Sequence, residues 1–304
     1  MTKILVTGAG GFLGRYLCAQ GSENFDVVGV DLSRESACRN CSWRTIGDER
    51  ELASVVQELQ PALTIHAAFV NRKPPQWSDT EYLQRALATN VAVFETIAEF
   101  GGRLLVVSSS AVYGTAEGGT AVTEVTPIHP VSLYGLAKAQ QEQAAQYFAT
   151  RGLELSIARL FNLCGPGQRA GMLLPDWVSR VVDVTSGKSD SLEVRHTSTS
   201  RDFVDVRDAA RALWLLTNDF HPDGIFNVAS GCAVGLWEVA EELRALCPRK
   251  LRILETQPQP GTADVAAQFG SYEKLRSAVG WQPTISWQSS LRELYEECLQ
   301  ARAA

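Results

Sequence analysis

Short apolar runs alternate with longer segments of helical period through the first half of the chain. The runs are rich in β-branched residues and are bounded by turn-forming residues, which is typical of buried strands. They are Ile4 to Thr7, Val27 to Asp31, Leu63 to Ala67, Leu104 to Ser108 and Leu155 to Leu160. Strands that alternate with helices predict βαβ units, and therefore an α/β fold with a doubly wound, Rossmann-type parallel sheet.

The pattern changes after Cys164, where a turn of glycine and proline is followed by mixed helices and isolated strands. We therefore expect a Rossmann domain over residues 1–164 and a smaller α/β substrate-binding region over residues 165–304. The run from Ile225 to Ala229 again has the pattern of a buried strand. Part of the C-terminal half is therefore expected to return to the first sheet.

The composition, with 45% hydrophobic and 20% charged residues among 304, is that of a globular protein. The 28 basic and 34 acidic residues give a net charge of −6, which disfavours nucleic acid as a partner. A few arginines can still bind an anionic small molecule. The sequence shows no signal-peptide pattern and no apolar run near the about 18 residues of a membrane helix, so we expect a cytoplasmic protein without a membrane partner. The cysteines and histidines have no spacing that predicts a metal site.

A glycine-rich turn follows the first predicted strand. It contains Gly8, Gly11, Phe12, Leu13 and Gly14. Glycines at this spacing allow a tight turn, let backbone N–H groups approach a pyrophosphate and direct a helix N-terminus at it. Asp31 ends the second strand, where a carboxylate can accept hydrogen bonds from an adenosine ribose. The sequence therefore predicts a bound nicotinamide dinucleotide; Asp31 favours NAD, although Arg34 leaves NADP possible.

A tyrosine and a lysine four residues apart form the candidate catalytic pair. Tyr134 and Lys138 lie in a segment of helical period, so their side chains are expected on one face, a turn apart. A lysine charge beside a tyrosine would lower the pKa of the phenol toward neutrality, which suits an acid/base catalyst. Ser108 to Ser110 follow a predicted strand at its carboxyl end, where bound nicotinamide is expected.

These segments resemble the extended short-chain dehydrogenases/reductases of the NAD-dependent epimerase/dehydratase family, which act largely on nucleotide sugars. The resemblance covers nearly the whole chain. Its motifs are TGAGGFLG (7–14), IHAA (65–68), SSSAVYG (108–114), YGLAK (134–138), RLFNLCGPGQ (159–168), RDFVDVRDAARA (201–212) and IFNVASG (225–231).

The resemblance implies roles for individual residues. Ser109, Tyr134 and Lys138 would be catalytic, and Lys138 would also hold the nicotinamide ribose. Asp48 would contact adenine, and Ala67 and Ala68 would line the cofactor cleft. On the substrate side the implied residues are Ser110, Asn90, Asn162 and, for a substrate diphosphate, Arg201.

The latter half of the chain is most similar to the reductase branch that makes GDP-6-deoxy-mannose-type sugars. The resemblance therefore implies NAD(P)-dependent reduction of the 4-keto group of a nucleotide-linked sugar. Two alternatives stay open: an epimerase with tightly bound NAD, and a reductase or dehydrogenase of a non-sugar carbonyl. The non-sugar alternative is suggested by Gln259, which stands where many relatives have an arginine that binds the substrate's diphosphate. Either Arg195 or Arg169 takes the place of that arginine, or the substrate is not an ordinary sugar diphosphate. The absence of an Asp-Glu pair between Ser109 and Tyr113 disfavours dehydration.

The segments from Leu83 to Ala98 and from Ser132 to Thr150 carry apolar residues on more than one face. The family resemblance implies that these helices form a four-helix interface, so we expect a homodimer.

Overall fold

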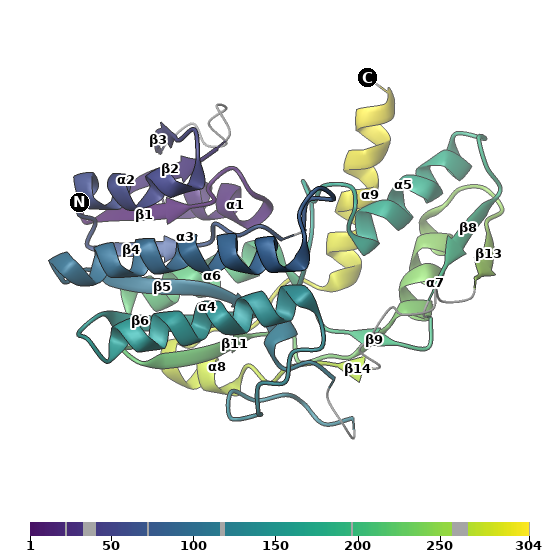
Figure 1. The fold of residues 1–304 in the computed structure, drawn as a ribbon. Helices are drawn as coiled ribbons and strands as arrows, with labels where there is room; N and C mark the ends of the chain where they lie inside the picture. The colour runs from purple at the N-terminus through teal and green to yellow at the C-terminus, as the bar shows by residue number, and fades with distance from the viewer. Residues whose placement is uncertain are drawn as a thin grey trace.

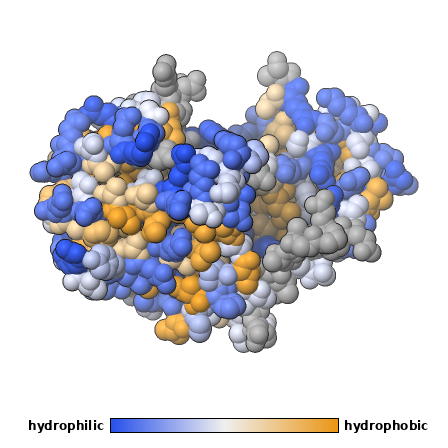
Figure 2. Space-filling view, viewed as in Figure 1, coloured by the Kyte–Doolittle hydropathy of each residue, from blue (hydrophilic) through white to orange (hydrophobic). Residues whose placement is uncertain are grey.

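The chain forms two lobes in a computed structural model that describes residues 1–21, 23–32, 41–71, 73–115, 119–195, 197–256 and 267–303. The larger lobe surrounds a parallel sheet, and the smaller lobe carries helices and short strands of the C-terminal half (Figure 1). Figure 2 shows the surface notched between the two lobes. No helix in these described ranges is long and apolar enough to cross a membrane.

The large lobe is built on a seven-stranded sheet of order β11-β6-β5-β4-β1-β2-β3, in which every pair is parallel. Its strands are β1 (Lys3–Thr7), β2 (Asp26–Asp31), β3 (Ser42–Thr45), β4 (Leu63–His66), β5 (Arg103–Ser109), β6 (Glu154–Leu160) and β11 (Gly224–Val228). This is the predicted doubly wound sheet, since the strand order reverses at β1 and β4.

Helices cover both faces of the sheet because the strands are apolar on both sides. Leu105 and Val107 of β5 join one buried cluster, whereas Leu104 and Val106 join the other. The first cluster includes α1 (Phe12–Gly21), α6 (Val206–Asn218) and α8 (Glu273–Val279), and the second includes α2 (Leu52–Leu59), α3 (Asp79–Phe100) and α4 (Leu133–Ala149). Short 3-10 turns, η1 (Glu49–Glu51) and η2 (Ser110–Val112), precede α2 and follow β5.

The C-terminal half returns to the large lobe at several points. Strand β11 pairs with β6, and the indole N–H of Trp214 on α6 donates to the Leu17 carbonyl at 3.1 Å. The fully buried Trp281 donates to the Asp208 carbonyl at 3.0 Å. Segments after residue 164 therefore contribute to both lobes, because α6 and α8 complete the apolar layer over the sheet.

The small lobe has its own apolar core, formed by α5 (Leu173–Thr185), α7 (Leu236–Leu246) and α9 (Trp287–Ala303). Strands β8 (Ser191–Val194) and β13 (Arg252–Glu255) pair in parallel beside them. Two further small sheets are β7 (Asn162–Cys164) with β10 (Phe203–Asp205), and β12 (Val234–Gly235) with β9 (Ser200–Arg201) and β14 (Ala267–Gln268).

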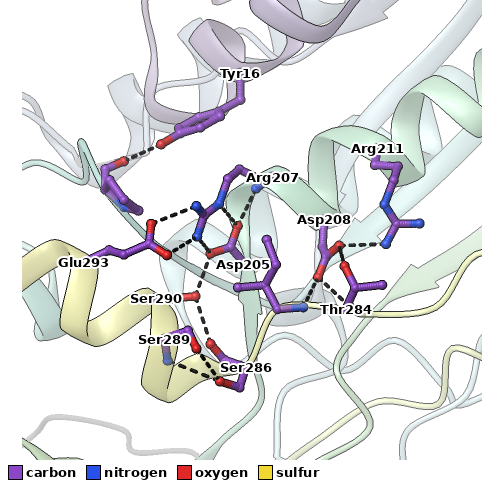
Figure 3. Close-up of polar contacts among 12 residues, drawn as sticks. Tyr16, Asp205, Arg207, Asp208, Arg211, Thr284, Ser286, Ser289, Ser290 and Glu293 are labelled. Carbon is purple, nitrogen blue, oxygen red and sulfur yellow. Dashed lines mark hydrogen bonds and ion pairs between the residues drawn. The ribbon is translucent and has the colours of Figure 1, made fainter.

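Buried carboxylates fasten α9 to α6 (Figure 3). Asp205 accepts hydrogen bonds from Arg207 and from the Ser290 hydroxyl, at 2.6 Å for the latter. Arg207 also pairs with Glu293 on α9 at 2.7 Å. Asp208, one turn further along α6, accepts hydrogen bonds from the backbone N–H groups that precede α9. The C-terminal helix is thus held to the large lobe by paired charges as well as by packing.

Candidate active site

The turn after β1 has the shape needed to bring a backbone close to a ligand. Gly8 has φ +70°, and a Cβ there would lie 2.8 Å from the backbone of Ala68. A Cβ on Gly14 would lie 2.1 Å from the Gly8 carbonyl oxygen. Both positions therefore need glycine, and the close packing lets α1 begin at Phe12 directly after the turn.

A cavity of about 280 Å³ opens beside this turn. Of the predicted cofactor residues, Gly8, Gly11, Asp31, Ala67 and Ala68 line it, with Asn90 at one side. The Asp31 carboxylate accepts a hydrogen bond from the Gly10 N–H at 2.9 Å, which holds it against the turn. The residues fit a dinucleotide, because the glycine turn, the helix N-terminus and the carboxylate meet at one cavity.

The other five predicted cofactor residues do not line this cavity: they are Phe12, Leu13, Gly14, Asp48 and Lys138. Leu13 is buried in the core, and the Phe12 ring packs edge-to-face on Tyr16. The Asp48 carboxylate pairs with Arg50 at 2.6 Å, which lowers its pKa to about 2. The adenine contact expected of Asp48 stays a prediction.

Ser109 and Tyr134 meet at the carboxyl end of β5. Ser109 caps η2 through its hydroxyl, which accepts from the Ala111 N–H at 3.2 Å. Burial raises the pKa of Tyr134 to about 12, and the neighbouring Ser109 side chain opposes this rise. The expectation that Lys138 lowers this pKa toward neutrality is wrong for this structure, because burial outweighs the neighbouring groups.

Lys138 is buried, and its ammonium makes two hydrogen bonds and one ring contact. Its ammonium donates to the Val107 carbonyl at 2.8 Å and to Gln141 at 3.0 Å, and lies 3.8 Å from the ring centre of Phe69. Burial lowers the pKa of Lys138 to about 7, opposed by Glu142. Phe69 also packs edge-to-face on Tyr134 and lines the cavity, so its ring links the candidate catalytic pair to the cofactor site.

Asn90 belongs to a buried chain of hydrogen bonds. Its side-chain oxygen accepts from His66 and Gln141, both at 2.8 Å, and its amide donates to the Ala86 carbonyl at 2.6 Å. Burial lowers the pKa of His66 to about 4, and its second ring nitrogen is paired with Thr7. Asn90 thus connects His66 to Gln141 and also lines the cavity. Its contact with the substrate stays a prediction.

A buried ion pair joins β6 to α4 next to Ser108, the neighbour of Ser109. Arg159 of β6 and Glu142 of α4 pair at 2.7 Å, and both side chains are nearly inaccessible. Arg159 also donates to the Tyr113 hydroxyl at 2.9 Å, and Ser108 donates to Glu142 at 2.5 Å. Because Ser108 precedes Ser109, this network anchors the end of β5 to α4.

The other predicted substrate residues lie in three short elements: Asn162 in β7, Arg201 in β9 and Ser110 in η2. Asn162 donates to the Asp202 carbonyl at 2.9 Å, and Arg201 on β9 is hydrogen-bonded to the Ser200 carbonyl. Ser110 is buried in η2. Arg34 and Gln259, on which the cofactor and substrate alternatives depended, lie outside the described residues.

Sequence reasoning missed Phe69, Gln141 and Glu142. The i, i+3 spacing of Lys138 and Gln141 on a helix could have indicated their contact. Phe69 carries no such signal, because its contact with Lys138 depends on the path of the loop after β4.

Comparisons with known proteins agree with this geometry. The sequence model of the family described as "NAD dependent epimerase/dehydratase family" matches residues 4–229. The chain is 26% identical to GDP-6-deoxy-D-mannose reductase of Pseudomonas aeruginosa, over 97% of this chain and 96% of that protein. It is also 26% identical to GDP-6-deoxy-D-talose 4-dehydrogenase of Aggregatibacter actinomycetemcomitans, over 99% and 98% of the two chains. The solved structure of RMD from Pseudomonas aeruginosa complexed with NADPH superposes with a TM-score of 0.84 at 25% identity, covering 99% of this chain and 100% of the other.

Proposed function

Because this chain belongs to the NAD-dependent epimerase/dehydratase family, we propose that it is an oxidoreductase that reduces the 4-keto group of a nucleotide-linked 6-deoxy sugar. The similarity to a GDP-6-deoxy-D-mannose reductase and to a 4-dehydrogenase of the same substrate class supports this choice of reaction. Bound NAD(P) would supply the hydride or accept it in the reverse direction.

The position of Tyr134 carries the proposal, because its phenol lies next to Ser109 and its ring packs on Phe69, which lines the cofactor cavity. Since burial raises the pKa of Tyr134 to about 12, its phenol holds a proton at neutral pH. A protonated phenol beside a serine hydroxyl can donate to a carbonyl oxygen, as hydride addition to the 4-keto carbon requires. Tyr134 would therefore be the general acid, and Ser109 would hold the same oxygen through a second hydrogen bond.

The residues around the cavity divide the binding task. The backbone from Gly8 to Gly14 would hold the pyrophosphate, and Asp31 the adenosine ribose. Lys138 would hold the nicotinamide ribose, and Ala67 and Ala68 would form the wall of the cleft. Because Asp31 would repel a 2′-phosphate, we infer a preference for NAD over NADP.

Arg201, Asn162 and Ser110 would bind the substrate. Arg201 is the candidate partner for the substrate's diphosphate, since guanidinium and phosphate form strong, charge-assisted hydrogen bonds. Its strand, β9, lies at the junction of the two lobes (Figure 1), where the substrate would extend from the nicotinamide toward the small lobe.

A substrate panel tests the function. Purified enzyme is incubated with NAD or NADP and GDP-6-deoxy-D-mannose, GDP-6-deoxy-D-talose or UDP-glucose, and absorbance at the wavelength of the reduced cofactor is followed. We expect net cofactor reduction with a GDP-6-deoxyhexose, and its loss in Tyr134→Phe with cofactor still bound. Epimerisation of UDP-glucose without net reduction, together with stoichiometric NAD released on denaturation, would instead identify an epimerase.

We also infer that the protein works as a cytoplasmic homodimer through α3 and α4. Leu87 on α3 and Leu136 on α4 are exposed, and apolar residues gather over these helices in Figure 2. Apolar helix faces of this kind favour association. Ultracentrifugation should show a dimer that Leu87→Glu weakens; a monomer at micromolar concentration would contradict this interface.

A further inference from the structure

Strand β14 (Ala267–Gln268) contacts both β9, which carries Arg201, and the turn η2, which follows Ser109. It pairs in parallel with β9, and Gln268 stands opposite Arg201 in that register. In Figure 1 the two strands lie beside each other at the junction of the lobes. The residues around Arg201 are thus joined by a sheet to a segment about 65 residues later in the chain.

The Gln268 side chain extends from this strand to the η2 turn. It is buried, and its amide nitrogen donates to the Ser110 carbonyl at 3.0 Å and to the Gly114 carbonyl at 3.1 Å. These two carbonyls bracket η2, the turn that begins directly after Ser109. One amide group therefore uses both of its N–H donors to hold the two ends of this turn.

The backbone after Gln268 strengthens the connection. Phe269 accepts from the Val122 N–H at 2.8 Å, and Ser271 donates to the Val122 carbonyl at 2.8 Å. Gly270 donates to the carboxylate of Asp202 at 3.1 Å. Asp202 is fully buried and directly follows Arg201 in sequence, so the segment is fixed both to the substrate strand and to the chain that follows η2.

We propose that Gln268 is a positioning residue for the reaction, which keeps the Ser109 turn in fixed geometry relative to the strand that carries Arg201. The proposal rests on the function proposed above, in which Ser109 and Arg201 contact opposite ends of one substrate. Misplacement of a reacting group by about 1 Å can lower the rate by about 100-fold. Loss of the Gln268 donors would leave the buried Gly114 carbonyl without its partner and the Ser110 carbonyl with only the Tyr113 N–H, so the turn would shift to recover hydrogen bonds.

The test compares Gln268→Met and Gln268→Glu with the wild type. Methionine fills a similar volume without donors, and glutamate adds acceptors against two carbonyls. We expect kcat to fall more than about tenfold in the methionine variant and further in the glutamate variant, with dinucleotide Kd unchanged within about twofold. Gln20→Met is the matched control, because Gln20 also donates from its amide to a carbonyl, that of Arg207, away from this turn; its kcat should be unchanged.

A double mutant identifies the route of the effect. If Gln268 acts through Ser109, the variant with both Ser109→Ala and Gln268→Met should turn over no more slowly than Ser109→Ala alone. Multiplied losses, or a Gln268→Met enzyme with wild-type kcat, would overturn the proposal. A residue that only fills space would be replaced successfully by methionine.

Hydrogen exchange gives a second measurement that does not depend on turnover. Peptides covering residues 109–114 should exchange faster in both Gln268 variants than in the wild type, while peptides of the glycine turn should not change. Unchanged exchange at 109–114 would refute the positioning role. A wild-type enzyme inactive on the whole substrate panel would refute the proposed function instead, and the exchange result would still decide whether Gln268 holds the turn.

Discussion

Replacing Lys138 with methionine should change how the stability of the protein depends on pH. Lys138 is 3% exposed, and burial lowers its pKa to about 7 from the ordinary 10.5. Between these two values the unfolded chain carries one proton more than the folded protein at this position. The wild type therefore gains stability as pH rises through this window, by about 1.4 kcal/mol per pH unit from this group alone. Below pH 7 Lys138 is protonated in both the folded and the unfolded state, and burial of its charge then lowers the free energy of unfolding by its full amount.

Methionine keeps most of the apolar side chain but binds no proton. The stability of Lys138→Met relative to the wild type should therefore fall by about 1.4 kcal/mol for each pH unit between about 7.5 and 10. In the folded protein burial lowers the pKa of His66 to about 4 and raises that of Tyr134 to about 12, so neither changes charge there in this range. Ionisation of these residues in the unfolded chain is common to both proteins and cancels in the difference. Glu142 opposes the shift of Lys138 and is present in both proteins.

Urea unfolding at half-unit steps of pH provides the measurement, with the two proteins compared at each step. Lys188→Met, at an exposed lysine, controls for the introduction of methionine. A constant difference between Lys138→Met and wild type across the range would refute the reasoning. It would mean that the ammonium at Lys138 keeps its proton in the folded protein despite burial.

Three further outcomes are expected. Glu142→Gln should destabilise the protein by about 3 kcal/mol in chemical denaturation, because it leaves the buried guanidinium of Arg159 without its charge partner; full stability would show that the pair is not structurally important. Asp31→Asn should raise the ratio of kcat/KM for NADPH over NADH by about tenfold, since a negative charge near the ribose is removed, and an unchanged ratio would place the ribose elsewhere. Gly14→Ala should abolish dinucleotide binding in a fluorescence titration, because its Cβ would lie 2.1 Å from the Gly8 carbonyl oxygen; wild-type affinity would argue against the turn as the pyrophosphate site.

The sheet could be predicted from the sequence because its central strands are buried on both faces. The run from Leu104 to Val107 is apolar without interruption, and β5 includes all of it. Strand β3 (Ser42–Thr45) was missed, since it lies at the edge of the sheet and is mostly exposed, with only Trp43 partly buried. An exposed edge strand has little apolar signal to detect.

The site was only partly predictable, because the sequence shows local spacing but not the three-dimensional surroundings of a residue. Local spacing along the chain places Gly8, Gly11 and Gly14 in one turn, and Tyr134 and Lys138 on one helix. It does not show what surrounds these residues in three dimensions. The raised pKa of Tyr134 depends on burial, and the role inferred for Gln268 depends on a strand that joins residues about 65 positions apart.

The return of β11 to the sheet has a consequence for how the protein is made. Ribosomes release the chain from its N-terminus, and early domains generally begin to fold before later segments emerge. Here β6 is complete at Leu160, but the strand that covers its outer edge begins only at Gly224. During synthesis of the intervening stretch, an almost wholly buried strand has one row of unpaired backbone groups facing outward. Open strand edges of this kind invite pairing with other chains. A nascent chain shorter than about 224 residues is therefore the form of this protein most exposed to aggregation, and the one for which chaperone protection matters most.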